Sequence, residues 1–142
     1  MPGQCQHPAG RLVNGELPVA DPMTGNVWMY TDADGAAYAP VFADLTGDGS
    51  VDAAAVTGCT AGGQLPQTLV FYSPGPTLIG SVELPNPNGE EHSDLQSMTV
   101  QGPDLGITFT TYDGAGFDFR YFAGRVHWNG TGMQLLDVQQ TG

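Results

Sequence analysis

Basic residues are nearly absent from this chain. Lysine does not occur in its 142 residues, and arginine occurs three times, at Arg11, Arg120 and Arg125. Fifteen acidic residues bring the formal net charge to −12. Nucleic-acid phosphates need a cationic protein surface and anionic lipid headgroups repel an acidic one, so we expect neither as a partner. The acidic balance favours cations, basic partners or simple solubility.

Long apolar runs and helical periodicity are also missing. No stretch approaches the roughly 20 apolar residues of a membrane-spanning helix, so none is expected in this chain. Met1 to Gly10 has no apolar segment of the kind found in a signal peptide. Hardly any window keeps apolar residues at positions i, i+3, i+4 and i+7, which argues against amphipathic helices.

Cysteine occurs twice, at Cys5 and Cys59. An even count in a chain rich in glycine and proline is typical of an oxidising compartment and predicts one disulfide. That bridge would close a loop of about 55 residues, worth roughly 4 kcal/mol in the chain-entropy model. Two free thiols, or lipid attachment at Cys5, are the alternatives. We therefore expect a secreted or cell-surface protein; if it is exported, this chain is the mature part or begins at an added Met1.

Alternation of apolar and polar residues predicts β-strands. Hydrophobic residues make up 40% of the chain, which is enough for a packed core. The 21 glycines and 11 prolines are scattered between short apolar runs, as expected for strands joined by turns. Alternation marks strands in the segments 78–84, 107–112, 117–122 and 125–128, and the run Thr68 to Tyr72 suggests a strand buried on both faces.

The chain is therefore expected to be mainly β. We expect one antiparallel domain over residues 27–142, built as a sandwich, a barrel or a single curved sheet. Residues 1–26 are turn-rich and are expected to wrap around it. Leu84 to Asp94 is expected to be a long loop. Asn129-Gly130 predicts a hairpin turn, with a glycosylation sequon as the alternative.

An acidic loop is the most specific chemical feature. In the segment Val41 to Val56 (VFADLTGDGSVDAAAV), alternate positions carry oxygen donors: Asp44, Thr46, Asp48, Ser50 and Asp52. Ca²⁺ takes six to eight oxygen ligands, and this set offers three carboxylates, a hydroxyl and the Ser50 carbonyl. Gly49 follows the middle aspartate, where the chain must turn sharply. We expect a Ca²⁺ site at the tip of a β-hairpin; the alternative is an Asp-Gly turn with solvated acids.

The spacing of this loop resembles the calcium loop of FG-GAP repeats, whose pattern is D-x-D/N-x-D-G-x-x-D. Asp44, Asp48, Gly49 and Asp52 match the pattern, and Thr46 departs from it. A hydroxyl in place of an acid or amide implies weak binding. The match occurs once, so it does not imply a propeller, and a structural role for the ion is expected.

A longer resemblance covers residues 42 to 138. The order ADLTGDGSVDAAAV, Cys59, LPQTLVFY, ITFTTYD and a final WNG hairpin resembles a secreted or lipoprotein-borne domain of actinobacteria. Members of that group are mostly of unknown function. The resemblance implies export and a β-rich fold, with lipid anchoring upstream of this chain as one form of attachment.

Signatures of catalysis are lacking. There is no G-x-S-x-G motif, and His7, His92 and His127 do not have the spacing of a zinc pair. His92 is expected to lie in a solvated acidic loop. The aromatic residues Phe117, Phe119 and Tyr121 are read first as core and second as a contact surface for glycan or protein. We expect a non-catalytic domain that binds an extracytoplasmic protein or cell-envelope component; a carboxylate-dependent hydrolase is the alternative.

Overall fold

The computed structural model describes residues 27–29, 40–59, 67–75, 77–89, 92–113 and 119–142. Within these ranges the chain forms nine β-strands and no helix, which confirms the all-β prediction. The strands form two antiparallel sheets, so the sandwich is the architecture observed among those expected. The expected wrap by residues 1–26 lies outside the described ranges.

The first sheet is built around β3 and β4. Its strands are β1 (Val27–Met29), β2 (Val41–Ala43), β3 (Asp52–Cys59), β4 (Thr68–Ser73) and β5 (Thr77–Glu83). The order is β1-β3-β4-β5. Strand β2 pairs with the first residues of β3, and β1 pairs with its last residues. Leu69, Val70 and Phe71 in β4 are at most 1% exposed, as predicted for a strand buried on both faces.

The second sheet is an antiparallel meander. Its strands are β6 (His92–Gln101), β7 (Asp104–Tyr112), β8 (Arg120–Trp128) and β9 (Met133–Gln140), in that order. Trp128 pairs with Met133, and the Asn129 amide donates to the Gly132 carbonyl over 3.0 Å, which confirms the predicted hairpin. A second tight turn, Gly102-Pro103, was not predicted. Gly102 has φ 59°, the left-handed conformation that glycine adopts at the first central position of a two-residue hairpin.

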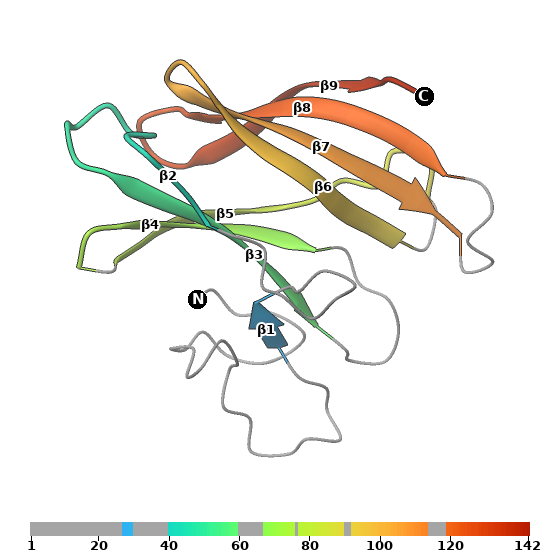
Figure 1. The fold of residues 1–142 in the computed structure, drawn as a ribbon, viewed down its shortest axis with the longest axis horizontal. Helices are drawn as coiled ribbons and strands as arrows, with labels where there is room; N and C mark the ends of the chain where they lie inside the picture. The colour runs from blue at the N-terminus through green and yellow to red at the C-terminus, as the bar shows by residue number, and fades with distance from the viewer. Residues whose placement is uncertain (1–26, 30–39, 60–66, 76, 90–91, 114–118) are drawn as a thin grey trace.

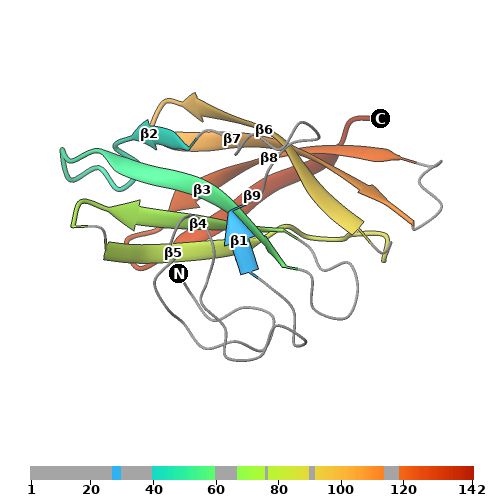
Figure 2. The same ribbon diagram turned by 60° about the horizontal axis from the view of Figure 1, so that its bottom comes forward.

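The two sheets pack face to face, as Figures 1 and 2 show with β3–β5 on one side and β6–β9 on the other. The core between them is apolar and includes Leu69 and Phe71 of β4, Leu105, Ile107 and Phe109 of β7, and Phe122 and Val126 of β8. Phe109 and Phe122 stack with centroids 5.2 Å apart. At the two margins β2 lies against β6 and β5 lies against β9.

Gln67 connects the sheets where the core ends. This buried side chain accepts the Leu95 amide hydrogen over 2.9 Å through Oε1 and donates to Asp94 over 3.3 Å through Nε2. Its backbone bonds to Ser93 on one side and to Leu84 on the other. A buried amide has to satisfy both of its polar atoms, so Gln67 fixes the position of β6 relative to the first sheet.

A β-bulge in β5 changes which side chains face the core from those that simple alternation predicts. The alternation placed Leu78 with Gly80, Val82 and Leu84, but the pairing skips Ile79 between Phe71 and Tyr72. An extra residue reverses the side to which the preceding side chains point. Ile79 therefore packs against the core and Leu78 is 38% exposed. Residues 84–89 of the predicted loop from Leu84 to Asp94 lie outside the strands, but its last residues do not, because β6 already begins at His92.

Candidate metal centre

The acidic segment joins β2 to β3. These strands pair antiparallel, and the last pair is Ala43 with Asp52, so Asp44 directly follows β2 and Asp52 is the first residue of β3. Gly47 and Gly49 take φ values of 78° and 84°. Side chains larger than glycine rarely adopt this conformation, so the two glycines allow the chain to fold back over Asp44.

Aspartate side chains hold the loop from inside. Asp44 accepts the amide hydrogens of Gly47 over 2.8 Å and of Gly49 over 2.9 Å, one on each carboxylate oxygen. Asp48 accepts the amide hydrogen of Ser50 over 2.8 Å. Such short-range bonds satisfy loop amides that no strand partner reaches. Taken alone, they describe a self-sufficient turn.

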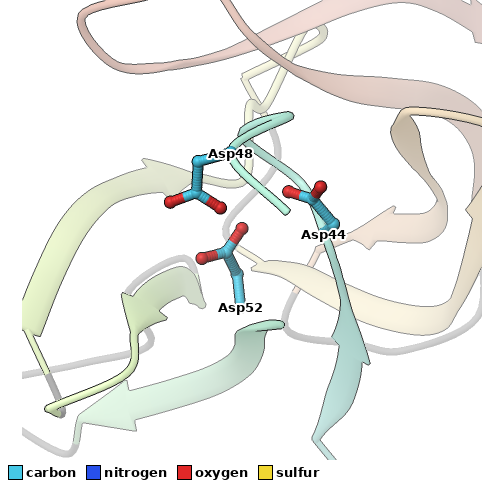
Figure 3. Close-up of side chains that lie close together, drawn as sticks. All are labelled: Asp44, Asp48 and Asp52. Atoms are coloured by element: carbon cyan, nitrogen blue, oxygen red, sulfur yellow. The ribbon is translucent and has the colours of Figure 1, made fainter. Parts of the chain in front are cut away.

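The three aspartates nevertheless converge. One oxygen from each of Asp44, Asp48 and Asp52 lies within 4.8 Å of the others. Figure 3 shows the carboxylates of Asp48 and Asp52 facing each other, with that of Asp44 beside them. Oxygens bound to one Ca²⁺ at roughly 2.4 Å can be at most about 5 Å apart, so this spread fits a shared ion. Without an ion, each pair of charges repels by roughly 1 to 4 kcal/mol.

Asp52 distinguishes this group from a solvated acidic turn. Its side chain is fully buried, at 0% exposure. Its Oδ2 accepts hydrogen bonds from the Leu45 amide over 2.9 Å and from the amide and hydroxyl of Thr46, each over 3.2 Å. Its Oδ1 is equally buried and has no hydrogen-bond partner. A buried carboxylate oxygen without a partner is costly, and a cation between the aspartates would supply the missing partner.

The remaining predicted ligands, Thr46 and Ser50, stay predictions. The hydroxyl of Thr46 is bonded to Asp52 Oδ2, and Ser50 contributes its amide hydrogen to Asp48. Among the histidine, cysteine and acidic side chains of the described ranges, the three aspartates come together as a group that could hold a metal ion. They can hold a metal ion through hard oxygen donors, and the fully buried Asp52 forms the base of the site.

The other predicted site residues lie away from this loop. Cys5 and Phe117 are outside the described residues; Cys59 ends β3, and its side chain is not described, so the disulfide stays a prediction. Phe119 and Tyr121 are 44% and 49% exposed, so reading them as core was wrong. The core aromatic of this segment is Phe122, at 4% exposure on the opposite face of β8.

His92 was expected in a solvated loop, and this was wrong as well. It is 8% exposed and its ring stacks on that of Tyr112, with centroids 4.2 Å apart. Tyr112 also donates from its hydroxyl to Asp94 over 2.7 Å. Because His92 opens β6 opposite Tyr112, strand pairing brings the two rings together. The acidic residues around His92 favoured a loop in the sequence analysis, so this pairing was not predicted.

A charged cluster that sequence reasoning missed lies on the second sheet. Asp104 accepts from Arg125 over 2.7 Å and is 2.7 Å from Nδ1 of His127, and Arg125 also donates to Asp137 over 2.6 Å. The bond to His127 is the largest cause that lowers the pKa of Asp104; Arg125 lowers it further, and burial opposes both. These residues are up to 33 positions apart in sequence, so only the strand register reveals the cluster.

Comparisons with known proteins identify no relative of this chain. No protein-family model matches the chain, and neither a curated protein nor a solved structure is significantly similar to it. The site is therefore interpreted from its own geometry.

The unpartnered oxygen of Asp52 leads to the first prediction. Asp52→Asn removes one of the clustered charges and places an amide donor where Oδ1 stands. In EDTA we expect the variant to be more stable than the unchanged protein by about 1 to 3 kcal/mol, measured by urea unfolding. With a divalent metal added, the unchanged protein should gain stability and the variant should not. An equal metal-induced gain in both proteins would contradict a role for Asp52 as a ligand.

The lowered pKa of Asp104 predicts loss of stability in acid. A carboxyl whose pKa is lower in the folded than in the unfolded chain contributes stability above the unfolded pKa, and this is lost as pH falls through the folded pKa. Asp104→Asn should therefore flatten the acid limb of a plot of melting temperature against pH. His127→Ala, which removes the largest cause of the shift, should move that limb to higher pH. Curves parallel to that of the unchanged protein would contradict the assignment.

Proposed function

We propose that this chain is a non-catalytic extracytoplasmic domain that binds a protein or a component of the cell envelope, and that Ca²⁺ clamps its β2–β3 loop. The buried, unpartnered Oδ1 of Asp52 is the observation that carries the metal part. It gives the acidic loop a reason to bind an ion beyond the mere abundance of acids in the chain.

The donor set favours Ca²⁺ over other common metals. The group consists of carboxylates alone, with no histidine or cysteine among its members, which suits a hard cation rather than zinc. Mg²⁺ demands near-ideal octahedral geometry and gives up its waters reluctantly, whereas Ca²⁺ accepts irregular oxygen cages. A loop with two left-handed glycines offers an irregular cage of this kind.

The position of the loop supports a structural role for the ion. All three aspartates come from one loop and the first residue of the following strand. Leu45, whose amide bonds to Asp52, is 5% exposed and belongs to the core. An ion that fixes Asp52 would thereby fix the point at which the loop enters the core. Exposed Asp48 leaves one side of the group open to water, which is consistent with weak binding.

The carboxylate pair on the second sheet does not suit the hydrolase alternative. A glycosidase-type mechanism needs one carboxyl held protonated near a second that is ionised. On the second sheet Asp104 and Asp137 are bridged by Arg125, and the pKa of Asp104 is lowered rather than raised. That pair therefore does not supply the general acid that the hydrolase alternative requires.

The extracytoplasmic part of the proposal rests on the two cysteines and on the resemblance described above. In the parts of the chain that the structure describes, no helix is long and apolar enough to cross a membrane.

Addition of Ca²⁺ should raise the melting temperature. For a dissociation constant of about 0.1 to 1 mM, the range of weak extracellular modules, roughly 10 mM Ca²⁺ adds about 1.4 to 2.7 kcal/mol. In a domain of this size this corresponds to a rise of several degrees in a thermal melt. Mg²⁺ at the same concentration should have a smaller effect, and Asp48→Ala should abolish the response to Ca²⁺.

The matched control is Glu83→Gln, which removes one exposed negative charge from β5, outside the loop. It should keep the full response to Ca²⁺. If millimolar Ca²⁺ leaves the melting temperature unchanged, or if the Glu83→Gln and Asp48→Ala variants lose the response equally, the site is not the one proposed.

A thiol count tests the compartment. The protein denatured without reductant should show no reactive thiol, because Cys5 and Cys59 are expected to be bridged. After reduction it should show both. Two free thiols before reduction, in protein recovered from its native source, would contradict the extracytoplasmic assignment.

A further inference from the structure

The sheet β6–β9 has an outer face, turned away from the first sheet (Figure 1). Because Ile107, Phe109, Phe122 and Val126 point into the core, alternation directs Thr108, Tyr121, Ala123 and Arg125 outward. Across this outer face runs a groove of about 250 Å³. All four strands contribute to its lining. This makes it a feature of the paired sheet rather than of a loop.

Polar groups surround an apolar floor in this groove. The polar lining side chains are Ser97, Thr99, Gln101, Thr108, Arg125 and Asp137. Ser97 and Thr108 are joined by a bond of 2.6 Å between their hydroxyls, and Gln101 lies directly over Gly106, where an added Cβ would approach its amide to 2.4 Å. Ile107, Ala123 and Gly124 supply the apolar part of the lining, which we call the floor, whereas Gly106 lies beneath Gln101. Hydroxyls and an amide around a carbon surface complement a sugar ring, which has an apolar face and a hydroxyl rim.

The charges in the groove do not favour an ionic ligand. Of the described residues that line it, Arg125 alone is cationic, and it is bonded to both Asp104 and Asp137. Since the guanidinium is already neutralised, a polyanion finds no free positive charge there, and the chain as a whole carries −12. Arg125 and Asp137, the two charged residues of the described lining, pair with each other, but Asp104 also bonds to Arg125 and leaves one negative charge in excess beside the groove. A polycation is therefore tested directly below.

The geometry also disfavours a peptide. A peptide that extends a sheet needs an exposed strand edge, but the groove lies across the middle of the sheet, where β7 and β8 are paired on both sides. A peptide bound by apolar anchors needs a deep apolar pocket. This groove is smaller than the roughly 300 Å³ at which small-molecule pockets begin, so it takes one unit of a longer chain rather than enclosing a whole ligand.

Two exposed aromatic residues lie beyond the groove toward the beginning of β8, Tyr121 within that strand and Phe119 directly before it. Tyr121 lies two residues before Ala123 on the same face, and Phe119 lies two residues before Tyr121. Two residues of extended chain span about 7 Å along the strand, and the ring of Phe119 packs against that of Tyr112 with centroids 4.9 Å apart. Both are more than 40% exposed, although the core of this segment has Phe122 to fill it. Exposed aromatic rings offer flat apolar surface for stacking.

From these observations we propose that the outer face of β6–β9 binds a neutral polysaccharide, with one sugar unit in the groove between Thr108 and Arg125 and the next stacked on Tyr121. This deepens the proposed function, since it rests on the domain being a binding module and names the ligand class. It does not depend on the metal loop, which belongs to the first sheet.

The test is native affinity electrophoresis in gels that contain soluble neutral polysaccharides: a β-glucan, an α-glucan, a mannan and an arabinogalactan. At least one should retard the protein. Tyr121→Ala should weaken that retardation by about tenfold or more, as expected when a central aromatic contact is lost. Ala123→Leu, which fills the floor of the groove without removing a polar group, should weaken it to a similar extent. Both variants should retain the melting behaviour of the unchanged protein.

Two matched variants separate this proposal from the metal proposal. Phe42→Ala removes an aromatic ring that is 65% exposed on β2 of the other sheet, and it should leave the retardation unchanged. Asp48→Ala should abolish the response to Ca²⁺ and keep the retardation. Loss of retardation in Asp48→Ala, with Tyr121→Ala unaffected, would place the ligand at the metal loop and overturn the proposal.

The choice of a neutral glycan is tested by two further gels, one with polygalacturonate and one with poly-lysine. Neither should retard the protein more than its charge predicts. Retardation by either one that Tyr121→Ala abolishes would overturn the neutral assignment, and so would a failure of all four neutral polysaccharides. In that last case, an intact response to Ca²⁺ would still support the metal site, and only the proposed glycan surface would be contradicted.

Discussion

The buried carboxylate of Asp52 is the constraint on which the first sheet depends at its β2 edge. It stands where β3 begins, is fully buried, and holds the backbone of Leu45 and Thr46 through one oxygen. Removing a carboxylate from water is costly unless its oxygens find partners, and the second oxygen finds none in the protein. The surrounding aspartates increase that cost by repulsion. A divalent cation is the simplest addition that turns these unfavourable terms into favourable ones.

The other oxygen of Asp52, Oδ2, links the loop to the interior of the sandwich. Leu45 follows Asp44 by one residue, its amide is bonded to Asp52, and its side chain belongs to the core. A change in the loop therefore acts on core packing and on the pairing of β2, which lies against β6 at the margin of the second sheet. At the other end of the core Gln67 performs a comparable task with neutral groups, and both of its amide atoms are satisfied. Of these two buried polar side chains, only Asp52 has an oxygen that an ion could serve.

Much of the fold was predictable from local patterns, because alternation and turn residues act over a few positions. Strands β4, β5 and β7, parts of β8 and the Asn129-Gly130 hairpin followed from them, whereas β6 was not predicted. Leu78 was assigned to the wrong face, since a bulge leaves no mark in the apolar pattern. The three aspartates were predictable because they share one loop, whereas the cluster of Asp104, Arg125 and Asp137 was not, because only strand register brings it together. The burial of Asp52 Oδ1 was not predictable, because it depends on how the loop packs in three dimensions.

The loop and the groove lie on separate sheets, and binding at each requires a different degree of rigidity. A metal clamp tolerates a flexible, glycine-bearing loop, because the ion itself supplies the order. A sugar surface gains from a frame that is already rigid, since polyhydroxylated ligands leave little surplus energy for ordering the protein. The groove meets this demand: its floor lies on β7 and β8, whose backbones are paired on both sides, and Arg125 is held by two carboxylates before any ligand arrives. The charged cluster thus fixes one wall of the groove, because its two ion pairs hold Arg125 on the outer face.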